Sequence, residues 1–410
     1  MSTAAETTPE PQGQGPLAGL RILDLATIIA APMASTLLSD YGADVLKVEL
    51  PGRGDGVRYF PPFKDGQSLW WKVINRNKRF ITLDLHQADG INLLKQLLPR
   101  FDVLVENFRP GTLDGWGLPR EVLWAINPKL VILRVTGFGQ TGPYSDQPGF
   151  ARIFEALGGL TYLTGEPDGE PMHSGYPLGD AVGGLFGAIA MLAALWPRAR
   201  NRDLPGEEID LSLTEGILKV LDYLPIEHQQ LGVVRGRSGN ANQYSAPSLV
   251  CKSADGRWFS LAGSTDALFA RNCAAIGQPG LAQDPRFANN GARVQHGATL
   301  NHIFRGWCAV QTGEQVMAAF HAAGGTIAPI YNAADIAADP HFAARQAIVD
   351  VPDLELGSVK MPAVVPRFAS APTALRHSAR AMGHDNDTVY GDWLGLSADE
   401  RQRLRNAKVI

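Results

Sequence analysis

The chain has 410 residues, with 37 basic and 41 acidic side chains and a formal net charge of −4 at pH 7. Because no long block of one charge sign occurs, we expect neither a nucleic-acid groove nor an anionic membrane as partner. With 45% hydrophobic residues, the chain can bury a large core, and its length predicts two or three domains. The expected partner is a small molecule or another subunit.

The first residues are rich in Thr, Pro, Gln and Gly and lack the charged and apolar regions of a secretory signal, so residues 1–16 are predicted to be a disordered tail. The three cysteines, Cys251, Cys273 and Cys308, are too few and too scattered for a disulfide framework. We expect them to be buried thiols in a reducing compartment, and the protein to be cytoplasmic.

Between residues 20 and 139, short β-rich runs alternate with helical patterns. This βαβ rhythm predicts an α/β fold with a parallel sheet and helices on its faces. Strands are expected at 20–25, 44–49, 80–85, 102–107 and 130–135, and helices at 32–41, 88–98 and 121–126. Ligands of such sheets bind beyond the carboxyl ends of the strands, so the loops of interest are 26–32, 51–58, 107–117 and 137–144.

Asp180 is a lone acid directly before an apolar segment, residues 181–196. At 16 residues, this segment falls short of the roughly 20 that span a bilayer, and its glycines favour close helix packing, so we expect a buried core helix. An aspartate at this boundary either caps the helix or reacts, and the position alone favours the cap.

The pattern changes after Leu218. A polar, glycine-rich stretch at 235–244 precedes a strand-like run at 258–262 and helices through Phe320, which indicates a second, smaller domain. Another β-like pair begins at Thr326, and a terminal helix at 398–407 could return to the first domain.

Several common sites are absent from the sequence. The turn after the first strand lacks the dinucleotide-binding motif GxGxxG, and no Gly-Lys-Ser/Thr of a phosphate loop follows the glycines at 51–56. The GxSxG motif of serine hydrolases is also absent. Because the histidines show no HExxH spacing, we expect no metal. The run Asn107-Phe108-Arg109-Pro110-Gly111 could meet a nucleotide's base and phosphates, or it could be a capped turn.

Taken together, the motifs resemble those of the family III CoA-transferases (the CaiB/BaiF family), the group that contains formyl-CoA:oxalate and carnitine CoA-transferases. The resemblance covers about residues 17–410 and rests on the motifs at 17–24, 41–49, 77–84, 106–111, 136–144, Gly179-Asp180 and 339–341.

The resemblance implies a large Rossmann-like, CoA-binding domain formed by both chain ends, residues 17–220 and 327–410, with a smaller central α+β domain at 221–326 and two subunits in an interlocked dimer. It also implies that Asp180 attacks an acyl-CoA thioester to give a mixed anhydride and then an aspartyl-CoA thioester. Backbone N–H groups at the helix start would favour the ionised aspartate.

Carried over by position, the CoA cleft would be lined by Ile29, Ala30, Leu83, Asp84, Leu85, His86, Asn107, Phe108, Arg109, Gln147, Pro148, Gly149 and Phe150. The sequence departs from the formyl-CoA type, since Leu50 and Gly115 stand where Arg residues reach CoA, Ile29 replaces Gln and Ala151 replaces an acid. Arg109 is then the first candidate for the CoA phosphates, with Arg58 or Arg79 second. No permanently bound cofactor is implied, because the CoA thioester is a substrate.

Two other functions stay open. An α-methylacyl-CoA racemase would need a histidine where Phe150 stands, and Phe cannot exchange a proton. A non-catalytic CoA-binding subunit of a hetero-oligomer would not need Asp180. For the transferase, Arg152 and His173 are candidates to bind a second carboxylate, and succinyl-CoA is a possible donor.

Overall fold

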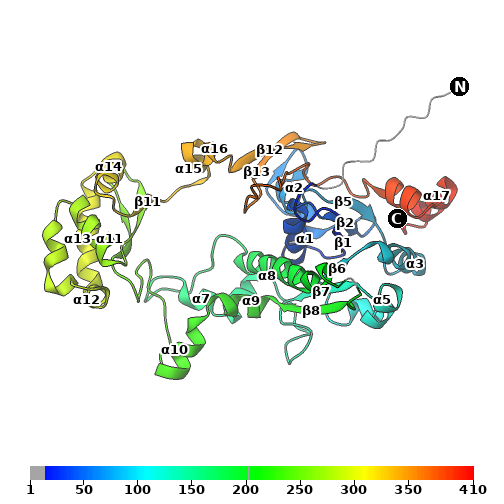
Figure 1. Ribbon diagram of the computed structural model, residues 1–410, viewed down its shortest axis with the longest axis horizontal. Coiled ribbons are helices and arrows are strands. Elements are labelled where there is room, and N and C mark those ends of the chain that lie inside the picture. The colour runs from blue at the N-terminus through cyan, green and yellow to red at the C-terminus, as the bar shows by residue number, and fades with distance from the viewer. Residues whose placement is uncertain (1–13, 202) are drawn as a thin grey trace. The chain divides into compact units, whose positions relative to one another are not determined.

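The structure is a computed structural model that describes residues 14–201 and 203–410 (Figure 1). Most of the predicted tail, residues 1–16, therefore lies outside the described residues. The chain forms two compact units. One contains the chain up to Leu160, Ser174–Tyr223 and Ala344–Ile410, and the other contains Thr161–His173 and Leu224–Ala343. The main segment of this second unit begins close to the predicted limit at 221 and runs past the predicted limit at 326, to Ala343, and the unit also contains the separate segment Thr161–His173.

The first unit is built on a six-stranded sheet in which every neighbouring pair is parallel. Its strand order is β5-β2-β1-β6-β7-β8, so the order reverses between β1 and β6, as in doubly wound nucleotide-binding folds. The strands are β1 (Arg21–Asp24), β2 (Asp44–Glu49), β5 (Arg79–Thr82), β6 (Val103–Glu106), β7 (Val131–Thr136) and β8 (Glu207–Ser212). The predicted parallel α/β sheet is confirmed, and β8 is an additional edge strand.

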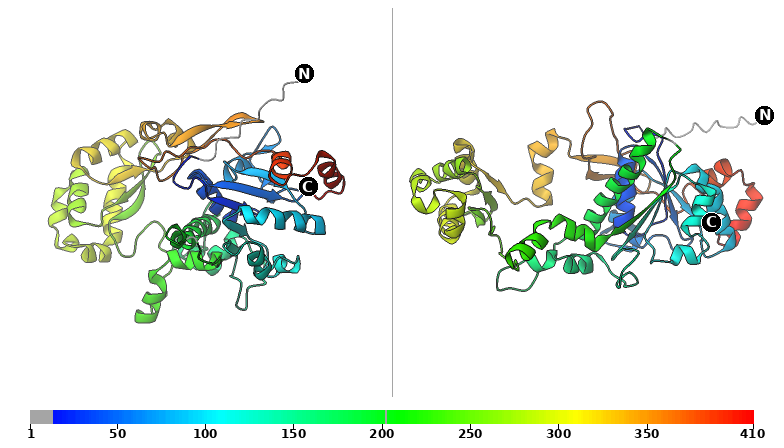
Figure 2. Two further views of the ribbon diagram at one scale, coloured as in Figure 1. Left: turned by 45° about the vertical axis from the view of Figure 1, so that its right-hand side comes forward. Right: turned by 60° about the horizontal axis from the view of Figure 1, so that its bottom comes forward.

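Helices cover both faces of this sheet (Figure 1). Alternate strand residues turn to opposite faces, so Ile22 and Val45 pack under one helical layer while Leu23 and Leu46 pack under the other. The first layer holds α1 (Ala30–Asp40) and α8 (Leu178–Leu195), and the second holds α3 (Ala88–Leu97), α5 (Arg120–Ile126) and α17 (Ala398–Asn406). The terminal helix α17 lies beside α3, where Arg403 donates to Asp89 at 2.9 Å (Figure 2).

Helices α1 and α8 approach closely because α8 presents glycines to α1. A Cβ on Gly184 would come within 2.9 Å of Met33 Cβ, and one on Gly187 within 2.9 Å of Ala34 Cβ. The segment Leu178–Arg198 is long and apolar enough to cross a membrane by length and composition alone, yet its glycine face is packed in the first unit. The expected buried core helix is confirmed for this face only, since the opposite face of α8 is exposed, with Ile189 at 61%.

The second unit has its own three-stranded antiparallel sheet in the order β11-β10-β9, covered by helices. Its core includes Cys251 and Cys308, whose Sγ atoms lie 3.0 Å apart although 57 residues separate them in sequence. The elements here are β9 (Ser248–Lys252), β10 (Trp258–Ala262), β11 (Ile327–Pro329), α11 (Asp266–Ala275), α12 (Asn290–Gln295), α13 (Gly297–Ala309), α14 (Gly313–Ala323) and α15 (Ala333–Ala338).

The remaining elements are short. They are β3 (Phe63–Lys64), β4 (Gln67–Ser68), α2 (Leu69–Ile74), α4 (Thr112–Gly115), α6 (Ala151–Leu157), α7 (Leu160–Leu163), α9 (Leu213–Val220), α10 (Tyr223–Leu231), α16 (Pro340–Ala344), and the hairpin β12 (Ile348–Asp353) and β13 (Gly357–Pro362). Of these, α6 and α9 pack against α8 and so help to position Asp180.

Candidate active site

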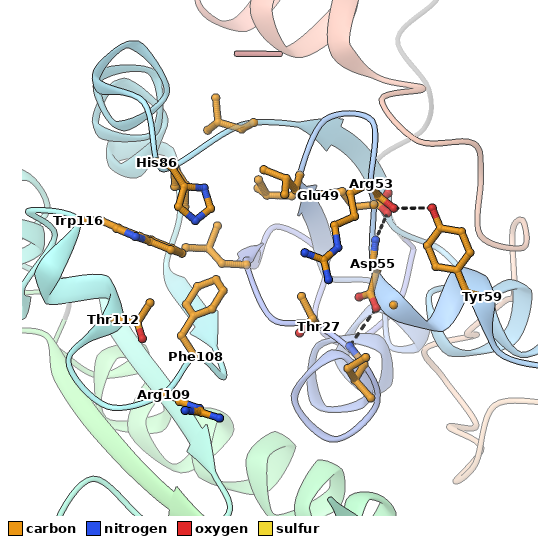
Figure 3. Close-up of a pocket in the computed structure, with 18 residues that line it drawn as sticks. Thr27, Glu49, Arg53, Asp55, Tyr59, His86, Phe108, Arg109, Thr112 and Trp116 are labelled. Carbon is orange, nitrogen blue, oxygen red and sulfur yellow. Dashed lines mark hydrogen bonds between the residues drawn. The ribbon is translucent and has the colours of Figure 1, made fainter. Parts of the chain in front are cut away.

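A cleft opens at the carboxyl ends of the strands, where the strand order reverses. Its volume is about 470 Å³, and the loops that follow β1, β2, β5 and β6 supply its walls (Figure 3). Three of the four loops expected from the sequence, 26–32, 51–58 and 107–117, contribute residues. The fourth, 137–144, does not line this cleft.

One wall of the cleft is aromatic. The ring of Trp116 stands edge-on to His86, with centroids 4.8 Å apart, and edge-on to Phe108 at 5.0 Å. Arg53 extends from the facing wall into the cavity, and Arg109 lies at its lower margin (Figure 3). A flat aromatic surface with two exposed guanidinium groups nearby suits a purine base and phosphate groups.

A buried ion cluster holds the floor of the cleft. Lys47 Nζ lies 2.9 Å from Asp55 Oδ2, and Lys78 Nζ lies 2.7 Å from Asp24 Oδ2; all four side chains are fully buried or nearly so. Burial alone would raise the pKa of Asp24, but Lys78 and Lys47 outweigh it and hold that pKa below its ordinary value. Burial lowers the pKa of Lys78 to about 8 against the opposing effect of Asp24.

This cluster fixes the first loop through Asp55, whose Oδ1 accepts the backbone N–H of Ile28 at 3.0 Å and that of Val57 at 3.0 Å. Ile28 has a φ of 71°, a left-handed conformation that is costly for a β-branched residue and persists only where the surroundings hold it. Ile28 lines the cleft and also a second cavity beside it.

The second cavity, of about 250 Å³, contains Asp180. Its other lining residues come from the loop after β1, from Phe60 and α2, from α6 with the residue before it, and from the segment before α8. They are Ile28, Ile29, Phe60, Trp70, Phe150, Ala151, Arg152, Ser174, Gly175, Tyr176 and Pro177. Because Ile28 belongs to both cavities, a molecule in the cleft can reach toward Asp180 past this one side chain.

Asp180 does not cap α8. The helix begins at Leu178, with Pro177 in the cap position, so Asp180 lies in the first turn. Burial raises the pKa of Asp180 to about 7, and the nearby Glu155 carboxylate raises it further in the same direction. Desolvation therefore opposes the ionised form that the start of the helix was expected to favour.

The structure separates the predicted CoA-contacting residues into three groups. Leu83, Leu85, His86, Phe108 and Arg109 line the cleft. Ile29 and Phe150 line the Asp180 cavity instead. Ala30, Asp84, Asn107, Gln147, Pro148 and Gly149 line neither cavity.

Two of the residues outside the cavities support the loops. The Asn107 side chain accepts from Thr27 N and donates to Thr27 O, both at 2.8 Å, and so ties the β6 loop to the β1 loop. Asp84 Oδ1 accepts the backbone N–H of His86 at 3.0 Å. These residues shape the cleft from behind.

Arg58 and Arg79, the second candidates for binding the CoA phosphates, form ion pairs outside the cleft. Arg58 pairs with the buried Glu49 at 2.7 Å and stacks over the Trp71 ring, and Arg79 pairs with Asp44 at 3.1 Å. Neither lines the cleft. His173 belongs to the second compact unit, where its Nδ1 lies 3.4 Å from Thr161 Oγ1.

Sequence reasoning missed Arg53, Tyr59, Thr112 and Trp116, which all line the cleft. Arg53, Thr112 and Trp116 fall inside loops that the strand pattern had singled out, so their position was the available signal. Glu155 was also missed. It is buried on α6, and its Oε1 accepts the backbone N–H of Gly179 at 2.9 Å.

Three comparisons with known proteins agree. The sequence model described as "CoA-transferase family III" matches residues 17–386. A succinyl-CoA–D-citramalate CoA-transferase from Chloroflexus aurantiacus is 42% identical over 96% of this chain and 98% of its own length. The beta subunit of the succinyl-CoA–L-malate CoA-transferase of that organism is 41% identical, with coverage of 96% and 98%. The crystal structure of a CAIB/BAIF family protein from Brucella suis superposes with a TM-score of 0.81 at 34% identity, covering 92% of this chain and 99% of that one.

Proposed function

Since this chain belongs to CoA-transferase family III, we propose that it transfers CoA from succinyl-CoA to a second small carboxylic acid, with Asp180 as the nucleophile. The enzyme is a CoA-transferase, and a CoA thioester is its substrate. The observation that carries the proposal is the position of Asp180, in a cavity that adjoins the nucleotide-sized cleft across Ile28.

The cleft accounts for the CoA half of the substrate. The adenine ring is held against the wall formed by His86, Phe108 and Trp116, and Arg53 and Arg109 bind phosphates. The pantetheine arm runs past Ile28, which brings the thioester to Asp180. Arg53 replaces the Arg contacts that are missing at Leu50 and Gly115.

The chemistry needs an aspartate and no bound cofactor. Ionised Asp180 attacks the thioester carbonyl, the C–S bond breaks, and a mixed anhydride and CoA thiolate form. The thiolate attacks the aspartyl carbonyl, which releases succinate and leaves an aspartyl-CoA thioester. The acceptor carboxylate attacks that thioester and displaces the thiolate. This attack gives a second mixed anhydride, between Asp180 and the acceptor. The thiolate then attacks the acceptor's acyl carbon in that anhydride, which forms the new CoA thioester and regenerates Asp180.

Arg152 is positioned to select dicarboxylates. It lines the Asp180 cavity, and within the described chain it makes no salt bridge, so its guanidinium is available to the far carboxylate of a succinyl group. Relatives are named for succinyl-CoA with D-citramalate or L-malate, and for succinate with glutarate, all of which are dicarboxylic acids. A racemase is not favoured, because the matching residue Phe150 lines the same cavity and exchanges no proton.

The assembly is proposed to be a dimer of the interlocked kind, with an identical or a related partner. An apolar stripe on α8 and the turn after it supports a partner at this surface: Leu185, Ile189 and Trp196 are 51%, 61% and 63% exposed. Light scattering of the purified protein tests the dimer, and a monomeric mass at all concentrations would refute it.

One experiment tests the nucleophile. The protein is incubated with succinyl-CoA and hydroxylamine, and the modified residue is located by peptide mass spectrometry. We expect a hydroxamate at Asp180 in the wild type and in Asp146→Asn, a control at an exposed acid, and none in Asp180→Asn. Absence of any adduct with a panel of acyl-CoAs would refute the covalent route. Deuterium exchange at the α-carbon of a 2-methylacyl-CoA would favour the racemase instead.

Activity with succinyl-CoA and a panel of carboxylates then identifies the acceptor. If Arg152 binds the far carboxylate, Arg152→Gln raises KM for dicarboxylates but leaves KM for monocarboxylates unchanged, and Arg152→Lys retains part of the preference. Equal effects on both acid classes would refute this role.

A further inference from the structure

The first turn of α8 is capped by another helix. Pro177 occupies the cap position, and its side chain has no acceptor for the backbone N–H groups of the first turn. The Gly179 N–H points instead to Glu155 Oε1 on α6, at 2.9 Å. Glu155 is 1% exposed, so this acceptor is buried beneath the turn that carries Asp180.

The contact between Gly179 and Glu155 leaves little space between α6 and α8. A Cβ on Gly179 would lie 3.3 Å from the Ala151 carbonyl oxygen and 3.4 Å from Glu155 Cγ, so α6 and α8 meet closely at this point. The neighbouring residue, Asp180, projects into the cavity, whereas Glu155 does not line it. Two carboxylates therefore lie on either side of one helical turn, one facing substrate and one facing the protein interior.

We propose that Glu155 is a positioning residue, which fixes the first turn of α8 and raises the free energy of ionised Asp180 before it attacks the thioester. The inference rests on the proposed role of Asp180 as nucleophile. Anhydride formation removes the negative charge from Asp180 and places it on the CoA sulfur. Repulsion from Glu155 is relieved in that step, so it lowers the barrier to attack relative to the ground state.

Other charged groups near this turn do not supply the effect. Among the elements packed against α8, α6 contributes Arg152 and Glu155, α9 contributes Glu215 and Lys219, and α1 carries its only charged residue, Asp40, at its other end. On β8, Asp210 stands between Ile209 and Leu211, which pack in the α8 layer, so its side chain turns to the other face of the sheet, where it accepts the Gln140 N–H. Tyr176 precedes the helix. After burial itself, Glu155 is the group that raises the pKa of Asp180, to about 7.

Glu155→Gln separates charge from hydrogen bonding, because the amide oxygen still accepts the Gly179 N–H while the charge is lost. Because the pKa of Asp180 is about 7, kcat/KM of the wild type at pH 5.5 should be about 3% of its value on the alkaline plateau. We expect Glu155→Gln to move this acid limb to lower pH, so that the fraction at pH 5.5 rises about threefold or more. Glu215→Gln, at an exposed acid on α9, should keep the wild-type profile.

Glu155→Ala also removes the acceptor. We expect kcat to fall about 10²-fold at every pH, since a misplaced nucleophile costs about that much, while KM for succinyl-CoA changes little. A purely structural role would lower the amount of folded enzyme without moving the acid limb of Glu155→Gln.

The outcomes are distinct. If Asp180→Asn keeps transferase activity, the proposed nucleophile is wrong. If Asp180→Asn is inactive but Glu155→Gln has the wild-type pH profile, the nucleophile stands and the role of Glu155 is refuted. Because Glu155→Gln keeps the size of the side chain and an acceptor for the Gly179 N–H, this test does not depend on the folding of the Ala variant.

Discussion

Replacing Asp24 by Asn removes one charge from the ion cluster beneath the cleft. Asp24 is fully buried at the end of β1, and it accepts from Ala26 N at 3.0 Å, Ser35 Oγ at 2.6 Å and Lys78 Nζ at 2.7 Å. The amide can keep at most part of this set, because its NH₂ group cannot accept and would face the Lys78 ammonium. Two buried lysines would then share the single carboxylate of Asp55.

The expected cost is large. Breaking a buried ion pair by removing one partner typically costs about 3–5 kcal/mol. The matched control is Asp350→Asn, which breaks the surface pair with Lys360, whose side chains are 61% and 70% exposed. An exposed pair of this kind contributes about 0–1 kcal/mol.

Urea unfolding followed by tryptophan fluorescence measures both variants. Because the folded pKa of Asp24 lies below 3.8, its contribution is present above that pH and is lost as the pH falls through the folded value. The wild type and Asp24→Asn should therefore differ most near neutral pH and converge in acid. A loss of less than about 1 kcal/mol at pH 7 would show that Lys78 is not held by this pair.

Three further outcomes are expected. Glu106 is buried, and burial raises its pKa to about 7, so its stabilising contribution is present below pH 4.5 and is lost as the pH rises to 7. In urea unfolding, the free energy of unfolding of Glu106→Gln should therefore exceed that of the wild type by up to about 3 kcal/mol at pH 8 and equal it at pH 4. Trp116→Ala should raise KM for succinyl-CoA about tenfold with kcat retained, since an aromatic platform contributes about 1–3 kcal/mol to base stacking; an unchanged KM would exclude this wall from adenine binding. In Gly90→Ala, the new Cβ would lie 2.0 Å from the Asp84 carbonyl oxygen, so thermal unfolding should show a loss of about 1–3 kcal/mol, whereas Gly115→Ala, with open space around it, should be neutral or stabilising.

The parallel sheet could be predicted because its central strands are buried on both faces and read as continuous apolar runs. β2 begins and ends at the predicted residues, 44 and 49. β8 was missed because Glu207–Ser212 is an edge strand with charged residues at three of its six positions, a pattern that alone does not distinguish it from a loop.

The cleft could be placed from the sequence, but several of its side chains could not. Strand order brings the β1, β2, β5 and β6 loops together, and their residue numbers follow from the strand pattern. Whether a given arginine faces the cleft depends on long-range pairing: Arg58 is bound by Glu49, whereas Arg53, five residues earlier, extends into the cavity. The raised pKa of Asp180 could not be predicted for a similar reason, since the start of the helix is visible in the sequence and the burial of Asp180 is not.

The narrow boundary at Ile28 has a consequence for how the enzyme can diversify. The cleft and the Asp180 cavity share Ile28, and their other lining residues differ. If the proposed function holds, substitutions at Arg152 or Trp70 change which acid is accepted and leave the lining of the cleft that binds CoA unchanged. A substitution at Gly56 would also act on this boundary, because a Cβ there would lie 2.7 Å from Ile28 Cδ1 and displace the Ile28 side chain. On that proposal, a few substitutions in the Asp180 cavity are enough to alter the acid that the enzyme accepts while the CoA-binding cleft stays the same.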